Sequence, residues 1–165
     1  MVAVRQLDLG RRRAGRSLSL HEYLKYRLGS HGGWTAWFNF FIKPFGAKSF
    51  AEFWRQWNPV YGYFLIYYCY RPLANVVPRP AAVMLTFATC GFVLHDLPAW
   101  ALTRRVLPPG ATIAFMMFGL GAIASDAVHM DLSKWPIMVR AVVNVTYLVA
   151  CVAAMLMVVL GLGRF

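Results

Sequence analysis

Two short stretches of this chain carry residues that could do chemistry in an apolar setting. Residues 53–58 (FWRQWN) combine aromatic rings with a cation and end in the amide of Asn58. Residues 85–96 are mostly apolar and end in His95 and Asp96. An ionisable side chain inside a membrane segment is costly, so its default interpretation is a functional site. The two stretches are therefore candidates for one site.

His95 is the candidate general base. It lies about two-thirds of the way along the apolar segment 81–102, roughly 20 Å from its start at the rise of a helix. A buried, neutral imidazole can take a proton from a hydroxyl group near neutral pH. The alternative is a packed histidine that bonds to a neighbouring helix. Asp96 points about 100° away from His95 on a helix, and we expect it to cap or brace the helix or to face water.

Asn58 has two interpretations. It precedes Pro59 at the start of an apolar segment, and Asn followed by Pro is typical of a helix N-cap. An Asn side chain can also donate a hydrogen bond to an oxyanion, or orient a thioester. Both interpretations stay open at the level of the sequence.

The composition places the chain in a lipid bilayer. Hydrophobic residues make up 59% of it and charged residues only 14%, with a mean hydropathy of +0.52. A soluble domain has about a quarter of its residues charged, so this chain cannot cover itself with polar surface. The formal net charge is +11. The cations flank apolar segments, which fits anionic lipid head groups and a cytoplasmic amino terminus and argues against nucleic acid as a partner.

The apolar segments predict an all-α membrane protein. We expect a small bundle of about four membrane-embedded helices, together with amino-terminal amphipathic surface helices. The expected elements are surface helices at 34–42 and 48–58, a helix over 59–77 interrupted at Arg71-Pro72, and membrane spans at 81–102, 111–128 and 137–162. Pro98 is expected to kink the first span, and Gly119 and Gly121 are expected to allow close packing of the second.

The first thirty residues are predicted to be a basic arm at the cytoplasmic membrane surface, or a dock for an anionic acyl donor. The arm contains Arg5, Arg11, Arg12, Arg13, Arg16, Lys25 and Arg27. A capping box of Ser19 and Glu22 is expected to begin a short helix there. Residues 31–165 are expected to form a single membrane-embedded domain, and no secretory signal is expected.

Other reactive side chains carry little signal. Cys69, Cys90 and Cys151 stand among apolar residues at spacings that suit no metal, so we expect buried thiols without a disulfide. His129 and Asp131 share a loop, but further ligands are lacking nearby, so no metal site is predicted.

The two stretches together resemble the membrane-bound O-acyltransferase (MBOAT) superfamily. The resemblance rests on residues 53–58, followed downstream by Phe87, Cys90, Gly91, His95 and Asp96, and it covers about residues 45–105. Because the first motif ends in Asn58, the nearer branch is the one with sterol and diacylglycerol acyltransferases and bacterial wax-type relatives. The branch that acylates bacterial cell-wall polymers usually has His at that position.

The resemblance implies an acyl transfer in the membrane. The donor would be a thioester, acyl-CoA or acyl carrier protein, used as a co-substrate without any permanently bound cofactor. The acceptor would be a hydroxyl of a lipid or glycan. His95 would be the general base and Asn58 would orient or stabilise. The implied donor and acceptor residues are Trp54, Arg55, Trp57, Tyr63 and Tyr67, with anchoring at the membrane interface as the alternative role.

The resemblance also bears on partners and location. Family members are usually longer, so the chain looks like a catalytic core that would self-associate or join a larger membrane protein. The implied location is a bacterial inner membrane. One alternative function is that of a non-catalytic accessory or assembly subunit derived from the same family. Another is a small channel or carrier that uses His95 and Asp96 in a proton path.

Overall fold

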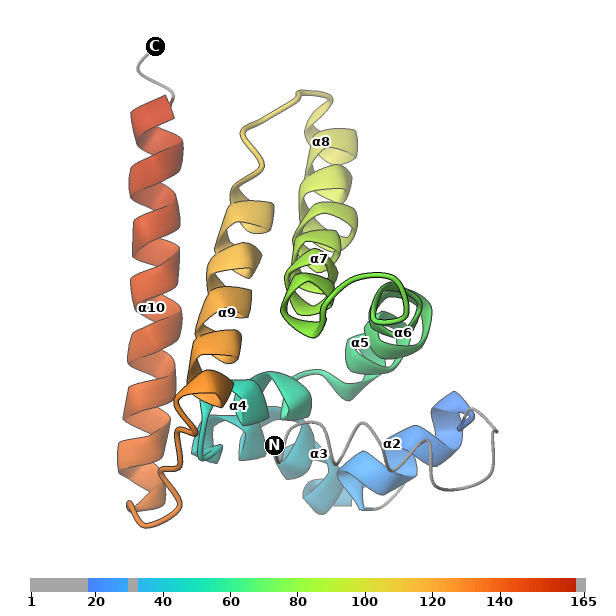
Figure 1. Ribbon diagram of the computed structural model, residues 1–165, viewed down its shortest axis with the longest axis vertical. Coiled ribbons are helices and arrows are strands. Elements are labelled where there is room, and N and C mark those ends of the chain that lie inside the picture. The colour runs from blue at the N-terminus through green and yellow to red at the C-terminus, as the bar shows by residue number, and fades with distance from the viewer. Residues whose placement is uncertain (1–17, 30–32, 163–165) are drawn as a thin grey trace. The chain divides into compact units, whose positions relative to one another are not determined.

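The computed structural model describes residues 18–29 and 33–162, and the regular structure in them is helical (Figure 1). Along the chain follow α2 (Leu20–Leu28), α3 (Gly33–Phe41), the 3-10 helix η1 (Lys43–Gly46), α4 (Phe50–Gln56), α5 (Pro59–Phe64), the π-helical turn η2 (Leu65–Tyr70), α6 (Arg71–Leu73), α7 (Arg79–Gly91), the π-helical turn η3 (Phe92–Asp96), α8 (Leu97–Thr103), α9 (Gly110–Ala127) and α10 (Ile137–Leu162). No strand occurs in these described ranges, and the all-α prediction is confirmed.

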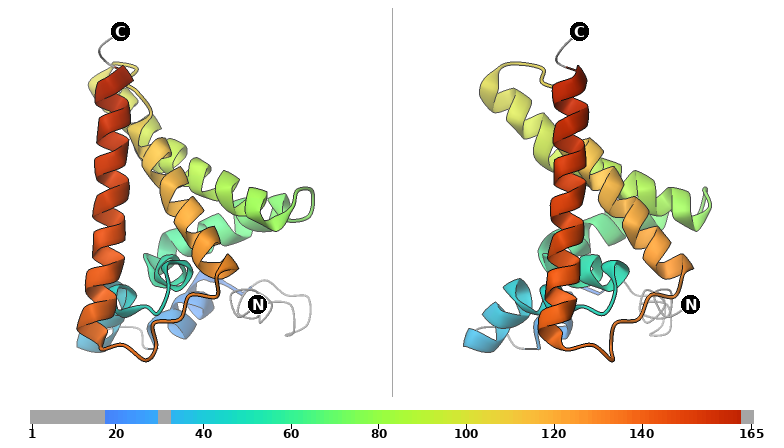
Figure 2. Two further views of the ribbon diagram at one scale, coloured as in Figure 1. Left: turned by 60° about the vertical axis from the view of Figure 1, so that its left-hand side comes forward. Right: turned by 90° about the vertical axis from the view of Figure 1, so that its left-hand side faces the viewer.

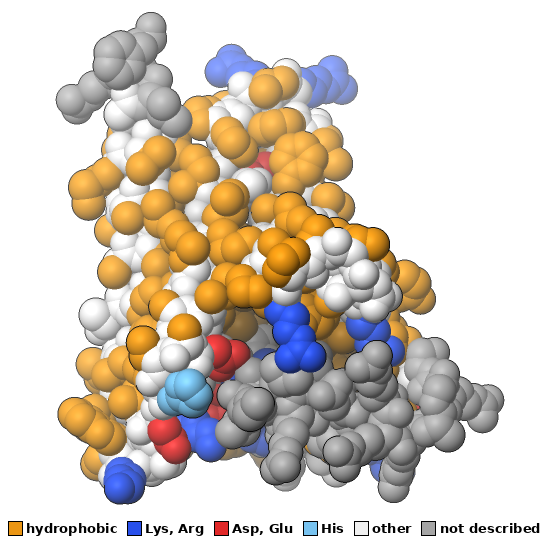
Figure 3. Space-filling model, viewed as in Figure 1, with side chains coloured by type: hydrophobic (Ala, Val, Ile, Leu, Met, Phe, Trp, Pro, Cys, Tyr) orange, Lys and Arg blue, Asp and Glu red, His pale blue; other side chains and the backbone are white. Residues whose placement is uncertain are grey.

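Among the described residues, three helical stretches are long and apolar enough to cross a membrane. They are Arg79–Thr103, Gly110–Ala127 and Ile137–Gly161, with mean hydropathies of 1.4, 1.4 and 2.4, and they match the three predicted spans. Only 22%, 28% and 11% of their apolar windows are buried inside the protein. Figure 3 accordingly shows hydrophobic side chains over much of the visible surface. The fourth predicted element, α5 to α6, is helical with an interruption.

Both interruptions are π-helical turns that end two residues before a proline. Pro72 and Pro98 each occupy the second residue of the helix that follows. Proline has no N–H and its ring collides with the carbonyl four residues earlier, and a wider turn relieves that collision. At the second site the Leu97 N–H donates to the carbonyl of Phe92, five residues back. The predicted break at Arg71-Pro72 is therefore a change of helix type, and the helix itself continues to Leu73.

The amino-terminal surface helices begin at side-chain caps. The Ser19 Oγ accepts from the Glu22 N–H at 3.3 Å, and Glu22 Oε2 accepts from the Ser19 N–H at 2.8 Å, which confirms the predicted capping box. Ser49 caps α4 in the same way, at 3.2 Å from the Glu52 N–H. Residues 1–17, with the arginines of the arm up to Arg16, lie outside the described residues. The division of the chain at residue 30 stays a prediction.

The chain forms two compact units, and each is considered by itself. The first comprises residues 1–64 and 124–144. Within it the fully buried Asn144 donates to the carbonyls of Phe45 (2.8 Å) and Ala47 (3.0 Å), and a Cβ on Gly46 would lie 2.9 Å from Ile137. The start of α10 therefore holds the turn before α4 in place.

The second unit comprises residues 65–123 and 145–165, and its helices α7, α8 and α9 can be followed in Figure 2. Small residues allow close contacts within this unit. The Tyr147 hydroxyl donates to the carbonyl of Met117 at 2.6 Å and passes so close to Gly121 that a Cβ there would overlap it. A Cβ on Gly119 would lie 3.1 Å from the ring of Phe87. The close packing predicted for Gly119 and Gly121 is confirmed.

Among the glycines of the second unit, Gly91 makes the closest approach to another stretch of backbone. A Cβ at this position would lie 2.6 Å from the Cα and 2.8 Å from the backbone nitrogen of Thr112. Gly91→Ala is therefore expected to destabilise the protein by about 1–3 kcal/mol, because backbone cannot move aside as a side-chain tip can. Thermal unfolding in lipid nanodiscs measures the loss. The matched control is Gly161→Ala, since a Cβ there meets no described atom within 4 Å. Equal unfolding temperatures for both variants would contradict the close contact.

Candidate active site

His95 lies in η3, and a backbone carbonyl fixes the state of its ring. Its Nδ1 lies 3.1 Å from the carbonyl oxygen of Cys90. A carbonyl oxygen can only accept, so Nδ1 carries a proton, and in a neutral ring this arrangement puts the lone pair on Nε2. The ring also lies 4.8 Å from the ring of Phe115 in α9. His95 is thus oriented as a base requires. Its side chain is exposed, so the described part of the chain does not enclose it as the sequence led us to expect.

Asp96 braces the neighbouring helix. It is only 6% exposed, and its carboxylate accepts from the N–H groups of Ala111 (3.0 Å) and Thr112 (2.8 Å) and from the Thr112 hydroxyl (2.6 Å). These donors belong to the first turn of α9. Of the roles expected for Asp96, the structure shows the brace and not a side chain facing water.

Asn58 caps α5 with one atom of its side chain. The Oδ1 accepts from the Tyr61 N–H at 3.2 Å, and the backbone carbonyl accepts from the Gly62 N–H at 2.9 Å. The cap interpretation is confirmed. The backbone has a φ of 37°, a left-handed conformation that Asn tolerates better than most residues. No described residue accepts a hydrogen bond from Nδ2, so this donor is available for a chemical role.

Packing fixes the aromatic residues of the first motif. Phe53 is 2% exposed, stacks on Trp57 at 5.5 Å and meets Trp54 edge-on at 5.1 Å. Trp57 also contacts Phe45 edge-on at 5.8 Å and stays 38% exposed. The two tryptophans predicted to line the donor entrance therefore pack on one buried ring.

Arg55 is a partly buried cation in this region. Burial is the main cause that lowers its pKa, while the negative charges of Asp126 and Glu52 oppose the shift and the positive charge of Arg27 adds to it. Its Nε is buried without a hydrogen-bond partner among the described residues. A guanidinium with an unused donor can bind an anionic or carbonyl oxygen.

The two predicted acceptor tyrosines both have contacts within the protein. The Tyr63 hydroxyl donates to the carbonyl of Leu18 at 3.0 Å, and its ring lies 5.5 Å from that of Tyr23. The ring of Tyr67 carries the guanidinium of Arg71 at 4.1 Å from its centre. These contacts serve the fold, and the predicted substrate roles are untested.

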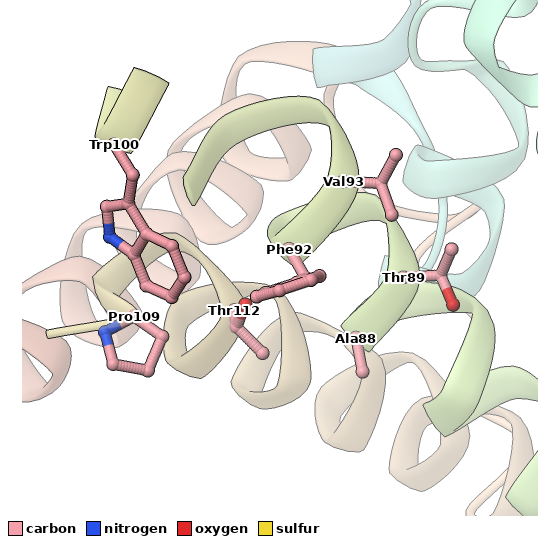
Figure 4. A pocket seen from close by; sticks show the side chains of 7 residues that line it. All are labelled: Ala88, Thr89, Phe92, Val93, Trp100, Pro109 and Thr112. Carbon is pink, nitrogen blue, oxygen red and sulfur yellow. The ribbon is translucent and has the colours of Figure 1, made fainter. Parts of the chain in front are cut away.

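An apolar groove lies beside the Asp96 contact. It measures about 420 Å³ and is open to the outside. Figure 4 shows the side chains that line it. The hydroxyls of Thr89 and Thr112 donate to Leu85 (2.8 Å) and Asp96 (2.6 Å), which leaves the wall mainly apolar. The groove is lined by Ala88, Thr89, Phe92, Val93, Trp100, Pro109 and Thr112. Sequence reasoning missed this groove, because its lining residues come from α7, η3, α8, the loop before α9 and α9 itself.

The predicted site residues divide between the two units. Residues 54–58 and Tyr63 belong to the first unit, whereas Tyr67, His95 and Asp96 belong to the second. A shared site of Asn58 and His95 stays a prediction. Sequence reasoning missed Thr112, and it named Gly91 as part of the motif without foreseeing its contact with Thr112. Pro109 was the available signal, because a proline ahead of a helix offers no side-chain acceptor and the helix start must find one elsewhere.

The remaining reactive groups have local roles. Asp131 accepts from the Ser133 N–H at 2.9 Å, and this bond is the main cause that lowers the pKa of the carboxyl group. His129 Nδ1 lies 3.1 Å from the carbonyl of Ala127. Within residues 18–29 and 33–162 no three His, Cys, Asp or Glu side chains are placed to hold a metal ion. Cys90 and Cys151 are buried free thiols, as expected, whereas Cys69 is a free thiol that is only half-buried.

Comparison with known proteins identifies the family. A family model described as MBOAT, membrane-bound O-acyltransferase family, matches residues 32–160. The match includes both motifs and all three spans, and the chain belongs to this family. The protein is accordingly an integral membrane protein of the O-acyltransferase class. No curated protein and no solved structure matches the chain.

Proposed function

We propose that this protein moves an acyl group from a thioester donor, acyl-CoA or acyl carrier protein, to a hydroxyl of a lipid or glycan acceptor. The observation that supports this most is the state of His95. Its Nδ1 is engaged by the Cys90 carbonyl at 3.1 Å, in an apolar span of a chain from an acyltransferase family. The lone pair on Nε2 is what a hydroxyl needs to become a nucleophile.

The proposed reaction is direct transfer. His95 Nε2 takes the proton of the acceptor hydroxyl as its oxygen attacks the thioester carbonyl carbon. The tetrahedral intermediate collapses with cleavage of the carbon–sulfur bond, and the leaving thiolate takes the proton back from His95. The products are an ester and a free thiol. Asn58 Nδ2 is proposed to donate to the thioester oxygen, where negative charge develops.

The remaining substrate contacts follow from the surroundings of each residue. The apolar groove beside Thr112 suits an acyl chain, because its walls offer almost no unpaired polar group. The unused donor on Arg55 suits an acidic or carbonyl group of the donor, and Trp54 and Trp57 are proposed to line its entrance. Tyr63 and Tyr67 remain candidates for acceptor contacts. Since the spans bury little of their surface, a second copy or a larger membrane partner is proposed to complete the surroundings of His95.

The orientation in the membrane follows from the positive charges near the two loops that connect the spans. If each span crosses the bilayer once, loops 104–109 and 128–136 lie on opposite sides of the membrane. The Leu132 N–H donates to the carbonyl of Lys48 at 2.9 Å, so loop 128–136 shares its side with the amino-terminal helices. That side has Lys25, Arg27, Lys43, Lys48 and Lys134, against Arg104 and Arg105 opposite. Positive residues favour the cytoplasm, and we propose a cytoplasmic amino terminus in a bacterial inner membrane.

Replacement of the base is expected to abolish the transfer. His95→Asn should lower the rate by about 10²–10⁴, the usual contribution of a general base. Membranes receive labelled acyl-CoA or acyl carrier protein, and label is followed into each lipid and glycan fraction. His129→Asn is the matched control, because His129 lies in the polar loop and Asn tolerates its φ of 53°. Full transfer by His95→Asn would overturn the role. Absence of transfer even by the wild type, inserted normally, would favour an accessory subunit.

The variant Asn58→Asp is expected to keep the role of Asn58 as helix cap and to lose its proposed role as hydrogen-bond donor to the thioester. Aspartate keeps the acceptor that caps α5 and loses the donating NH₂ group, so stability should change little. Transfer should fall by about 10²–10³, the cost of losing one oxyanion donor. The same transfer assay and thermal unfolding measure the two effects. Wild-type activity in Asn58→Asp, combined with instability of Asn58→Ala, would show that Asn58 is only a cap.

Loop 128–136 and loop 104–109 are expected to face opposite sides of the membrane. Ser133→Cys should react with a membrane-impermeant maleimide only from the cytoplasmic side, and Arg105→Cys only from the other side. Both positions are exposed, and the wild type with its three native thiols supplies the background. The labelling is measured in intact cells and in inverted vesicles. Labelling of both cysteines from the same side would contradict the topology.

A further inference from the structure

The π-helical turn that holds His95 is tied at both ends to the same two residues of α9. At one end Gly91 lies against Thr112 and Ala111, where an added Cβ would be 2.6 Å from the Thr112 Cα and 2.7 Å from the Ala111 oxygen. At the other end the Asp96 carboxylate accepts from the N–H groups of the same residues. His95 lies between these two ties.

The tie at Asp96 replaces a cap that α9 lacks. Pro109 precedes α9 and has no side-chain acceptor. Of the first amides, Gly110 N–H donates to the Pro108 carbonyl at 2.7 Å and Ile113 N–H to the Pro109 carbonyl at 3.1 Å. The N–H groups of Ala111 and Thr112, which lie between these two, donate to the Asp96 carboxylate. Every N–H of the first turn therefore has an acceptor. A carboxylate at this end also interacts favourably with the helix dipole.

We propose that Asp96 is a positioning residue for His95 and not only a cap for α9. The proposal rests on the function proposed above. Phe115, which lies against the His95 ring at 4.8 Å, follows Ala111 and Thr112 by about one helical turn. The bonds of Asp96 therefore fix both the π-helical turn and the ring that flanks the imidazole. Loss of the carboxylate releases His95 from its bond to Cys90 even where α9 stays folded.

Pro109→Ser separates the two roles, because serine at this position gives α9 an acceptor of its own. The full-length wild type, Asp96→Ala, Pro109→Ser and the double variant are compared in nanodiscs. We measure the unfolding temperature, kcat and KM for the labelled acyl donor, and the ¹⁵N signals of labelled histidine. The His95 signal is assigned by its loss in His95→Asn. Asp96→Asn, which keeps the shape and one acceptor, replaces Asp96→Ala if that variant does not fold.

The double variant is expected to unfold at nearly the temperature of Pro109→Ser, while its kcat stays about 10- to 100-fold below that of Pro109→Ser, the scale of a misplaced catalytic group. Relative to Pro109→Ser, the KM of the double variant should change less than about threefold, because both variants carry the same substitution in the groove. The His95 signal should move from the ring protonated at Nδ1 to a mixture of both forms. Recovery of kcat together with the wild-type signal would overturn the proposal and leave Asp96 as a cap.

The ¹⁵N measurement keeps the two proposals apart. If the wild type transfers no acyl group, the proposed function fails, and the histidine signal alone tests Asp96. A signal that loses its Nδ1 proton in the double variant supports positioning without turnover. A His95 ¹⁵N signal that is unchanged by the loss of Asp96 overturns the positioning role of Asp96.

Discussion

The structure around His95 depends on one constraint, which is that buried backbone polar groups must find hydrogen-bond partners within the protein. The start of α9 presents N–H groups in an apolar region and lacks a capping side chain. Asp96 supplies the acceptor from the neighbouring span. A buried carboxylate and two unpaired amides would each be costly, and together they satisfy one another. The contact holds the two spans in one register, and it gives the Asp96 carboxylate and both amides hydrogen-bond partners.

The same constraint explains why the span through His95 is not a regular α-helix. Pro98 removes one N–H and displaces the carbonyl ahead of it, and the chain accommodates this by a π-helical turn over Phe92–Asp96. Such turns are often found at functional sites. Here the turn lets the Cys90 carbonyl accept from the His95 ring at 3.1 Å. The proline thus helps to define which imidazole nitrogen keeps its lone pair.

Local signals in the sequence were sufficient for the elements. Hydropathy predicted the three spans, Ser19 with Glu22 predicted the start of α2, and Asn58 before Pro59 predicted a cap. Contacts between distant residues were out of reach. Asp96 bonds across 15 and 16 residues and Asn144 across 97 and 99, and periodicity says nothing about which helices approach. A π-helical turn is equally hidden, because one extra residue per turn barely changes an apolar pattern.

Asn58 shows why a residue can satisfy a structural and a chemical interpretation together. Its Oδ1 and its Nδ2 are separate atoms, and capping uses only the first. The left-handed φ of 37° is a conformation that costs free energy in most residues. A Ser or Asp would cap α5 about as well, yet neither offers an amide donor. The cap and the left-handed backbone together favour Asn or Asp at this position, and of these two only Asn also offers an amide donor.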